Sequence, residues 1–427
     1  MSFRIAPFKA LRYDEARLAR AGCGPEASTA AVLDRVAAPP YDIISPDAHR
    51  SLLARSPYGI VRLTLGDQPG QTADYGARSR LLTVWKREGI LREDPRESFY
   101  VYGTEYTIPG TKDRASFRGL LALGSLHEFP EKLVLPHEQT FPKVVDDRFR
   151  ILEATRTHLE MILLLYADPE GRIDGILEQA SKGRPEVSVE GKPGEVHALW
   201  RIPGGPDEGQ LRELFRGQRP IIADGHHRYT TALRYLRERS GDGTSASGAR
   251  WQPMVLGNLF GKGLAILATH RLVAVGGKEA EALRILEKNL APAPDGAAAD
   301  FEVETRGGRR RFALPKALRE SKKGVARTNY ALLHDVVLGQ WLQPLLQAGA
   351  PEGGAVKYFK DGTGEREALV RGEGDLLIRM LPVDRAEFRE VVEGGEVFPH
   401  KTTFFYPKLW SGLALWTMTE PVAEEGC

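Results

Sequence analysis

Residues 219–233 (RPIIADGHHRYTTAL) constrain the fold more than any other stretch of the chain. The apolar run that begins at Ile221 follows Arg219 and Pro220 and predicts the end of a buried strand. The chain then turns at Asp224 and Gly225. Beyond the turn, apolar residues recur with the i, i+3, i+4, i+7 spacing of an amphipathic helix, at Tyr229, Ala232, Leu233 and Leu236. The sequence therefore predicts a strand, a tight turn and a helix, in that order.

The start of this helix combines an amide-rich terminus with several basic side chains. Asp224 has the chemistry of an N-cap, because its carboxylate can accept a backbone N–H from the first turn. His226, His227 and Arg228 follow where unpaired N–H groups and the positive end of the helix dipole gather. We favour an anion site here, above all for phosphate. The structural alternative is a capped helix whose basic side chains are solvated or bonded to neighbouring carbonyls.

The composition indicates that any such anion site is local. Lys plus Arg number 59 and Asp plus Glu 57, so no global field draws the 427-residue chain to nucleic acid or to a membrane. The two cysteines, Cys23 and Cys427, form neither a disulfide framework nor a paired-thiol metal site, which fits a reducing cytoplasm. The first residues lack the apolar core of a signal peptide, and the longest apolar run, near 161–166, is too short to span a bilayer. We therefore expect a cytoplasmic protein without a membrane partner.

A second concentration of polar residues lies in the proline-rich stretch at 133–148 (LVLPHEQTFPKVVDDR). Loops of this kind often carry catalytic groups. This one offers an imidazole, a carboxylate, a hydroxyl, an ammonium and a guanidinium, from His137, Glu138, Thr140, Lys143 and Arg148. The alternative is a polar loop with a local Asp–Arg pair, and the spacing leaves both interpretations open. No second His follows His137 at i+4, which excludes a zincin motif.

Elsewhere the patterns predict short strands and helices in mixed order. Strands are expected at 4–7, 59–65, 99–106, 117–126, 163–167, 253–260, 264–267, 301–304, 311–314 and 376–380. The runs at 253–260 and 264–267 are expected to form a strand pair. Helices are expected after Ser45 and Pro46, at 74–89, after the 133–148 stretch, at 276–290, near 330–346 and at 385–393. This mixture predicts an α+β protein with mixed sheets. We expect an N-terminal α/β region at 1–127, a central region at 128–290 and a C-terminal α/β region at 291–427, which together form one cleft.

Several motifs together resemble a bacterial family known as domain of unknown function 1015. They are AAPPYD at 37–42, HEQT at 137–140 with the following Lys and Asp-Arg, ADGHHRYTTAL at 223–233, THR at 269–271 and HKTTFFYPK at 400–408. The resemblance runs from Phe8 to Lys408 and so covers nearly the whole chain. His400 departs from it, because an uncharged residue is expected at that position. The family has no settled activity that could be carried over to this chain.

The Asp-Gly-His-His-Arg core at 224–228 is similar to the corresponding motif of ParB/sulfiredoxin-like proteins, including free-serine kinases. In those proteins such a turn and helix start hold nucleotide phosphates. The similarity implies a ParB/sulfiredoxin-like core with flanking α/β regions, and ATP or ADP with Mg²⁺ as cofactors. The phosphate contacts would come from Asp224, Gly225, His226, His227 and Arg228.

The residue types suit phosphoryl transfer, which depends mainly on well-placed donors and cations. Arg228 can hold two oxygens at once and stays charged at any working pH. Gly225 lets the backbone approach a ligand without an intervening Cβ. His226 and His227 lie ~100° apart around a helix, so we expect one to face the phosphates and the other to pack.

A kinase also needs a base and usually a magnesium ligand. Glu138 is the first candidate for the base, and Asp42 and Asp147 are carboxylates available to a hard cation. The candidate catalytic residues are Glu138, His227 and Lys143. Further cationic side chains could complete the nucleotide site, namely Lys143, Arg148, Lys401 and Lys408. For each of these residues a solvated side chain or an ordinary surface ion pair is the structural alternative.

We therefore expect nucleotide-dependent phosphoryl transfer to a small hydroxylated metabolite, with free L-serine as the leading acceptor. A phosphatase or nucleotide hydrolase could use the same pocket with water in place of the acceptor. A third hypothesis is a non-enzymatic ParB-like regulator that binds nucleotide or DNA. The near-zero net charge and the lack of a clear basic recognition helix argue against nucleic acid. The oligomeric state is left open.

Overall fold

The computed structural model describes residues 2–21, 32–67, 74–202, 204–239, 246–294, 296, 298–346, 354–360 and 362–418. The chain forms two compact units. Unit 1 comprises Met1–Thr107, Arg114–Leu264 and Pro407–Cys427, and unit 2 comprises Ile108–Asp113 and Ala265–Tyr406. The three regions expected from the sequence do not coincide with these units, since residue 127 lies inside unit 1 and residue 290 inside unit 2. Residues on both sides of the first expected boundary belong to unit 1 because of long-range strand pairing, in which residues 119–125 of β5 (Arg114–Ser125) pair with β11 (Trp251–Asn258).

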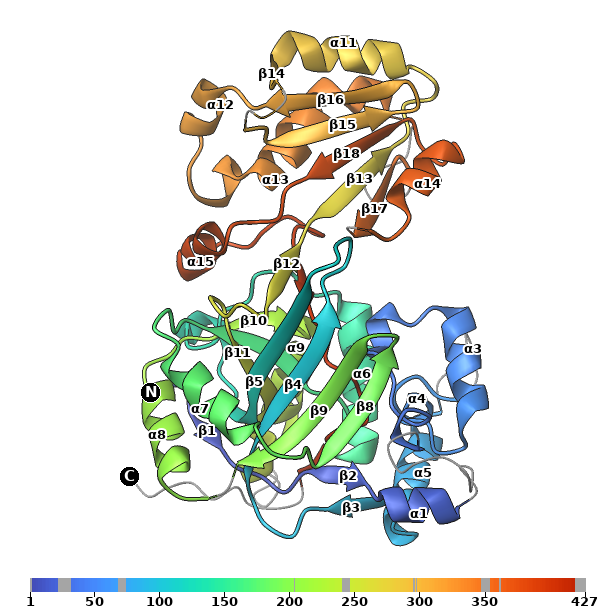
Figure 1. The fold of residues 1–427 in the computed structure, drawn as a ribbon, viewed down its shortest axis with the longest axis vertical. Helices are drawn as coiled ribbons and strands as arrows, with labels where there is room; N and C mark the ends of the chain where they lie inside the picture. Colours follow the sequence, from blue (N-terminus) through green and yellow to red (C-terminus); the bar gives the residue numbers. More distant parts are fainter. Residues whose placement is uncertain are drawn as a thin grey trace. The chain divides into compact units, whose positions relative to one another are not determined.

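Unit 1 is built on an eight-stranded mixed sheet in the order β10-β7-β11-β5-β4-β9-β8, with β1 paired to β5 (Figure 1). Strands β7 and β11 run parallel, whereas the other neighbours are antiparallel. The remaining strands of this sheet are β1 (Ile5–Ala6), β4 (Phe99–Thr107), β7 (Ile162–Tyr166), β8 (Val187–Lys192), β9 (Glu195–Ile202) and β10 (Ile221–Asp224). Two small antiparallel pairs accompany it, β2 (Leu11–Tyr13) with β3 (Leu91–Glu93), and β6 (Thr157–His158) with β20 (Trp416–Thr417).

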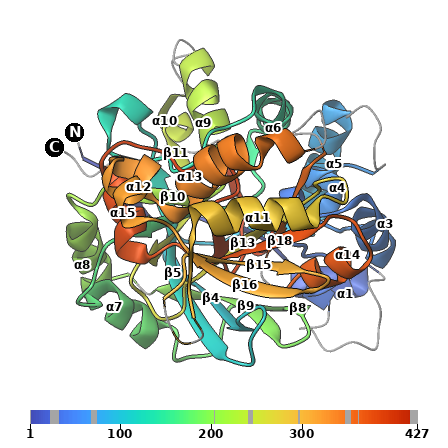
Figure 2. The same ribbon diagram turned by 90° about the horizontal axis from the view of Figure 1, so that it is seen from above.

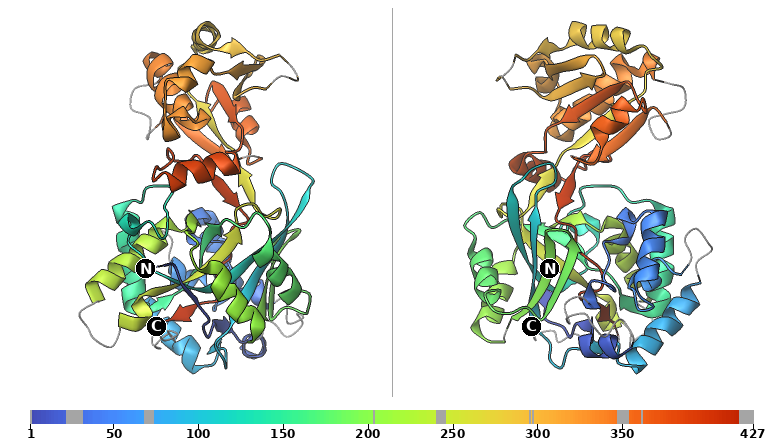
Figure 3. Two further views of the ribbon diagram at one scale, coloured as in Figure 1. Left: turned by 90° about the vertical axis from the view of Figure 1, so that its left-hand side faces the viewer. Right: turned by 45° about the vertical axis from the view of Figure 1, so that its right-hand side comes forward.

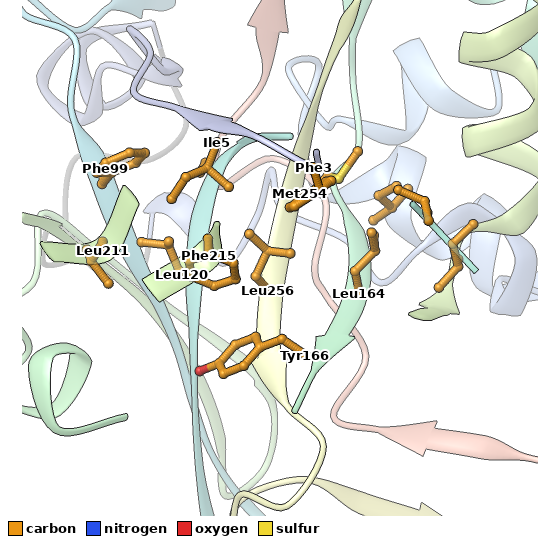
Figure 4. Close-up of a cluster of buried hydrophobic side chains, with 14 of the residues drawn as sticks. Phe3, Ile5, Phe99, Leu120, Leu164, Tyr166, Leu211, Phe215, Met254 and Leu256 are labelled. Carbon is orange, nitrogen blue, oxygen red and sulfur yellow. The ribbon is translucent and has the colours of Figure 1, made fainter. Parts of the chain in front are cut away.

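The core of unit 1 forms where alternate residues of these strands meet helix α8 (Figure 4). Side chains two residues apart point to the same face of a strand. Leu164 and Tyr166 of β7 and Met254 and Leu256 of β11 therefore share one face, and each is at most 1% exposed. Phe215 of α8 packs on this face, with its ring centroid 5.0 Å from that of Tyr166.

Side chains cap the first turn of two helices of unit 1 that the sequence predicts, α3 and α5. The Ser45 hydroxyl accepts from the Ala48 N–H at 3.2 Å, and the Asp74 carboxylate accepts from the Ala77 N–H at 2.8 Å. Helices α3 and α5 therefore start where the sequence predicts. The helices are α1 (Glu15–Arg20), η1 (Tyr41–Ile43), α3 (Pro46–Arg55), α4 (Val61–Thr64), α5 (Tyr75–Arg87), η2 (Phe129–Glu131), α6 (Pro142–Thr155), α7 (Arg172–Ala180), α8 (Pro206–Phe215), α9 (His226–Arg239) and α10 (Ala246–Ala249).

Two predictions about short apolar runs are wrong. Residues 59–65 form the helical turn α4 rather than a strand, because a short run that is buried on successive residues does not reveal its period. The runs at 253–260 and 264–267 do not pair with each other. Instead β11 pairs with β5 and β7, and β12 (Ala265–Leu267) pairs with β19 (Phe404–Tyr406).

Unit 2 contains a six-stranded sheet in the order β14-β16-β15-β18-β13-β17, seen from two further sides in Figure 3. Its strands are β13 (Thr269–Val273), β14 (Ala291–Pro292), β15 (Phe301–Thr305), β16 (Gly308–Ala313), β17 (Val356–Lys360) and β18 (Leu376–Met380). Helix α11 (Glu279–Asn289) packs against the π-helix η4 (Leu333–Trp341), and Figure 2 shows α11 in yellow. The other helical segments are α12 (Lys316–Glu320), η3 (Gly324–Arg327), α13 (Asn329–Leu332), η5 (Gln343–Leu345), α14 (Glu365–Val370) and α15 (Arg385–Glu393).

Helices and strands thus alternate irregularly in both units, and each unit has its own sheet. The prediction of an α+β protein with mixed sheets is confirmed. Across the described ranges, no helix is long and apolar enough to cross a membrane.

Candidate functional site

The strand, turn and helix predicted at 219–233 are confirmed. Strand β10 ends at Asp224, and α9 begins at His226. Gly225 joins them with φ of 96°, and a Cβ at this position would lie 2.5 Å from Cγ2 of Ile162. The glycine is thus required by its left-handed backbone and by close packing against Ile162, rather than by the approach of a ligand. The first hydrogen bond of the helix runs from the Tyr229 N–H to the Gly225 carbonyl. The N–H groups of residues 226–228 therefore take no part in the i to i−4 hydrogen bonds of the helix.

The Asp224 carboxylate pairs with two cations and does not act as the expected N-cap. One oxygen contacts Nζ of Lys408 and the other accepts from Nη2 of Arg228 at 2.6 Å. The three side chains are only 10–11% exposed. Burial raises the pKa of Asp224, but the charges of Lys408 and Arg228 outweigh it and lower this pKa to about 2. Asp224 is therefore ionised and holds together residues that are 184 positions apart.

The Arg228 guanidinium is largely committed to the protein. Nη1 donates to the Met161 carbonyl and Nη2 to Asp224, while Nε is buried and has no hydrogen-bond partner among the described residues. Burial opposes its charge, but the carboxylates of Glu160, Asp224 and Asp42 raise the pKa of Arg228 above its ordinary value. The expected two-pronged grip of Arg228 on a phosphate is therefore not prearranged, because both Nη atoms already serve internal acceptors.

The AAPPYD motif brings Tyr41 and Asp42 to the same cluster. The Tyr41 ring lies under the Arg148 guanidinium, with 4.1 Å from Cζ to the ring centroid. Asp42 is exposed to solvent, and no described residue donates a hydrogen bond to its carboxylate. The surrounding protein and the negative charge of Asp224 raise the pKa of Asp42. Asp42 is thus the carboxylate of this cluster that is best placed to receive a ligand.

Glu160 completes the cluster and was not anticipated from the sequence. Its Oε1 accepts from the Tyr41 N–H at 3.2 Å and from the Ser411 hydroxyl at 2.8 Å. The residue is only 7% exposed, and it interacts electrostatically with Arg228 and Asp42. The signal that could have revealed it is a single carboxylate within the otherwise apolar run at 159–166.

The two histidines at the start of α9 both support the HEQT loop. Nε2 of His226 accepts from the His137 N–H at 3.3 Å, and Nε2 of His227 accepts from the Phe141 N–H at 3.0 Å. His226 is the packed histidine of the pair. Its burial, helped by His137, lowers its pKa to about 3, so its ring is neutral and adds no positive charge. Glu138 lies between these two anchor points and interacts electrostatically with His137 and His226.

Asp147 and Arg148 form a local Asp–Arg pair, which is the alternative to a catalytic role that the sequence leaves open for the stretch at 133–148. Arg148 donates through Nε to Asp147 at 2.9 Å and through Nη1 to the Thr64 carbonyl at 2.9 Å. The other Asp147 oxygen accepts from the Tyr75 hydroxyl at 2.8 Å. Burial raises the pKa of Asp147, but Arg148, Tyr75 and Arg78 together bring this pKa below its ordinary value. Both Asp147 oxygens are occupied, so this residue does not fit the expected role of a magnesium ligand.

Neither Lys143 nor Lys401 is among the residues that form the charge cluster of unit 1. Lys143 is exposed in the first turn of α6. Lys401 belongs to unit 2, where its residue has φ of 57° and its carbonyl accepts from Nη2 of Arg271 at 3.0 Å. The Thr269 hydroxyl donates to the same carbonyl. The THR and HKTTFFYPK motifs thus meet in unit 2 through backbone and buried side chains.

The cluster formed by Asp42, Glu160, Asp224, Arg228 and Lys408 has three carboxylates and two cations, so its formal charge is −1. Within the described parts of the chain, no three or more His, Cys, Asp or Glu side chains are arranged to hold a metal ion. Mg²⁺ that arrives with a nucleotide often uses one or two carboxylates together with phosphate oxygens and water. Asp42 fits that requirement, because the residue is exposed and no described residue donates a hydrogen bond to its carboxylate.

A small cavity of about 50 Å³ adjoins this cluster. It lies within a depression of about 410 Å³ that includes open solvent. Charged and polar groups line it together with three apolar side chains. The lining residues are Thr64, Arg148, Ile151, Leu152, Thr157, His158, Leu159, Glu160, Arg228, Thr231 and Gln252.

The fold and the site define an α+β protein with a buried charge cluster at a strand–turn–helix junction. The chain belongs to the family described as protein of unknown function DUF1015, whose model matches residues 5–331. The resemblance inferred from the motifs is thereby confirmed. No curated protein matches the sequence.

Several solved structures are similar to part of this chain. A free serine kinase in complex with AMP is 16% identical with a TM-score of 0.32, over 64% of this chain and 83% of that protein. SbnI with a C-terminal truncation from Staphylococcus aureus is 16% identical with a TM-score of 0.36, over 67% and 82% of the two chains. A variant of the free serine kinase in complex with ADP is 18% identical with a TM-score of 0.33, over 70% and 91%. AMP and ADP are the ligands of the two free serine kinase structures.

Proposed function

We propose that unit 1 is a nucleotide-dependent phosphotransferase that acts on a small hydroxylated metabolite, with free L-serine as the leading acceptor and ATP or ADP as donor. The observation that carries this proposal is the cluster of five charged groups around the first turn of α9. Asp42 lies near Asp224 in this cluster, although like charges repel and burial of charge is costly. Such arrangements are typical of functional sites, where charged groups are brought together for binding or catalysis.

The start of α9 supplies the phosphate-binding elements of the proposed site. The amides of residues 226–228 precede the helical ladder, and the helix dipole favours negative charge at this end. Lys408 provides a cation beside Asp224. Because the side-chain cluster carries a formal charge of −1, the phosphates also need Mg²⁺, which would neutralise their charge when held by Asp42.

Glu138 is proposed as the base that receives the acceptor's proton. The hydroxyl oxygen of the acceptor forms a bond to the terminal phosphorus while the bond from that phosphorus to the nucleotide oxygen breaks. The hydroxyl proton passes to Glu138, and the nucleotide leaves one phosphate shorter. The histidines hold the HEQT loop on both sides of Glu138, so they act as positioning residues. Lys143 stays a candidate for long-range attraction of phosphates.

A product assay tests the proposal against its alternatives. The protein is incubated with Mg²⁺ and ATP or ADP, with and without L-serine, and phosphoserine and inorganic phosphate are measured separately. Phosphoserine supports the kinase, whereas phosphate release that is independent of serine supports the hydrolase. Nucleotide binding without turnover, or retention of short duplex DNA in a gel-shift assay at moderate salt, supports the regulator.

A carboxylate variant links the activity to the cluster. Asp42→Asn removes the proposed magnesium ligand, so we expect activity to fall at least tenfold and to require more Mg²⁺. Asp47→Asn is the matched control, because Asp47 is also an exposed aspartate of unit 1 but lies in α3, where it pairs with Arg50. Equal activity of the two variants would show that Asp42 has no part in the reaction.

A further inference from the structure

Two residues that line the same small cavity of unit 1 each have one buried polar atom without a hydrogen-bond partner among the described residues. Gln252 in β11 is 1% exposed, and its Oε1 has no hydrogen-bond partner among the described residues. Nε of Arg228 is also buried and unpartnered within the described chain. Both residues line the cavity of about 50 Å³ next to the charge cluster. Buried polar atoms in native proteins nearly always have a partner, so the cavity calls for an occupant with polar atoms of its own.

The size of the cavity restricts that occupant. A water molecule needs roughly 10–15 Å³ of such volume, so the cavity has room for only a few polar atoms. A nucleotide is far too large for it. The surrounding depression of about 410 Å³ is open to solvent, so one end of a small ligand could extend outward.

The chemistry of the lining restricts the occupant further. Arg228 Nε requires an acceptor, whereas Gln252 Oε1 requires a donor. The lining also contains charges of both signs, from Arg148 and Arg228 on one hand and from Glu160 on the other. A complementary ligand therefore has a negative group and a positive group a short distance apart, as an α-amino acid does. The rest of the lining includes an apolar wall formed by Ile151, Leu152 and Leu159. This wall disfavours a long charged side chain on the ligand, because it offers that charge no partner.

We infer that this cavity is the acceptor subsite and that it binds a small zwitterionic amino acid. The ligand's carboxylate accepts from Nε of Arg228, and its ammonium group donates to Oε1 of Gln252 and to the Glu160 carboxylate. Its role as an acceptor subsite rests on the proposed function. The amino-acid class rests on the cavity alone, and Gln252 becomes a residue that determines specificity.

Titration calorimetry with the full chain tests this inference without any substitution. L-serine carries both charged groups, whereas 3-hydroxypropanoate lacks the ammonium group and ethanolamine lacks the carboxylate. We expect L-serine to bind at least tenfold more tightly than either analogue, because each analogue leaves one buried atom unpaired. Equal affinities, or no binding of L-serine, would mean that the cavity holds water only and would overturn the inference.

A matched pair of variants ties the binding to Gln252. Gln252→Leu removes the Oε1 acceptor, and we expect L-serine affinity to fall about tenfold. Gln218→Leu is the control, because Gln218 is a glutamine of unit 1 whose side chain donates to the Ala167 carbonyl and does not line the cavity. Unchanged affinity in a folded Gln252→Leu protein would overturn the assignment, and the comparison of ligands decides the case if this variant does not fold.

Nucleotide binding is measured separately, by thermal shift with ATP and ADP in the presence of Mg²⁺. Nucleotide binding without amino-acid binding would overturn this inference and leave the proposed function standing. Amino-acid binding without nucleotide binding would support the subsite and contradict the phosphotransferase. If neither ligand binds, both proposals fail.

Discussion

The buried pair between Lys408 and Asp224 provides the sharpest prediction of stability. Its side chains are 11% and 10% exposed, so replacement of Lys408 by methionine keeps most of the packing volume but removes the charge. Asp224 then keeps one cationic partner, Arg228, beside the carboxylates of Asp42 and Glu160. Breaking a buried ion pair by removing one partner typically costs about 3–5 kcal/mol. We expect Lys408→Met to lose stability at the low end of this range, because Arg228 remains.

The pH dependence gives an independent magnitude for the same pair. The pKa of Asp224 falls from an ordinary 3.8 to about 2 on folding, and one pKa unit corresponds to about 1.4 kcal/mol. A carboxylate with a lowered folded pKa adds stability above its unfolded pKa, and this stability is lost as the pH falls toward the folded pKa. Asp224 thus contributes about 2–3 kcal/mol at neutral pH, lost between about pH 4 and pH 2. Lys408→Met should lose less on acidification than the parent, because part of this contribution is already gone.

Hydrogen exchange of the amides of β10 and α9 measures this effect in unit 1 itself. Parent and Lys408→Met are compared at pH 7 and pH 3. Lys86→Met is the matched control, because Lys86 forms an ion pair with Glu93 at 3.8 Å while both side chains are more than a third exposed. Such a surface pair contributes about 0–1 kcal/mol. If these amides exchange at the same rate in Lys408→Met as in Lys86→Met, the pair between Lys408 and Asp224 contributes no more stability than a surface ion pair, and the reasoning is refuted.

Three further predictions concern the same strand–turn–helix junction and one helix cap. Gly225→Ala should lower Tm more than Gly171→Ala, because both glycines have positive φ but only Gly225 also meets Ile162 at 2.5 Å. The ring of His226 should show no NMR titration from pH 8 to pH 5, since its pKa in the folded protein is about 3. The stability that the neutral His226 ring contributes is present above the unfolded-state pKa near 6.5 and is lost as the pH falls below 6.5. Asp74→Ala should destabilise α5 by about 1 kcal/mol through loss of its cap, measured as faster amide exchange at the start of α5.

Local signals predict the elements that position the site. Apolar spacing and the Asp-Gly turn are sufficient for β10 and α9, and cap residues are sufficient for α3 and α5. These features depend on interactions between residues close in sequence, so their signal is local. The helical turn α4 is not predicted, because the run at 59–65 has apolar residues at 60, 61, 63 and 65 and is too short to distinguish a strand from a helix.

The partners of the site residues could not be predicted in this way. Asp224 looks like an N-cap in the sequence, yet its carboxylate binds Lys408, which is 184 residues away. The adjacent histidines look like phosphate ligands, yet each accepts a backbone N–H from the HEQT loop. An imidazole, a carboxylate or a guanidinium can serve several partners, and only the packing of distant segments selects among them. The motifs therefore identify which segments meet, but not which atoms bond.

The balance of charges indicates what the cluster lacks. Asp224 is matched by Lys408 and Arg228, and Glu160 is held by the Tyr41 N–H and the Ser411 hydroxyl. Asp42 has no comparable donor among the described residues and lies near the negative charge of Asp224. A cation bound at Asp42 would relieve this repulsion, and a nucleotide phosphate would supply the oxygens that complete its shell. The same step would bring phosphate to the amides at the start of α9. The Asp42 carboxylate, which would bind the cation, and the amides of residues 226–228, which would bind the phosphate, thus complement each other as one binding site for a magnesium nucleotide.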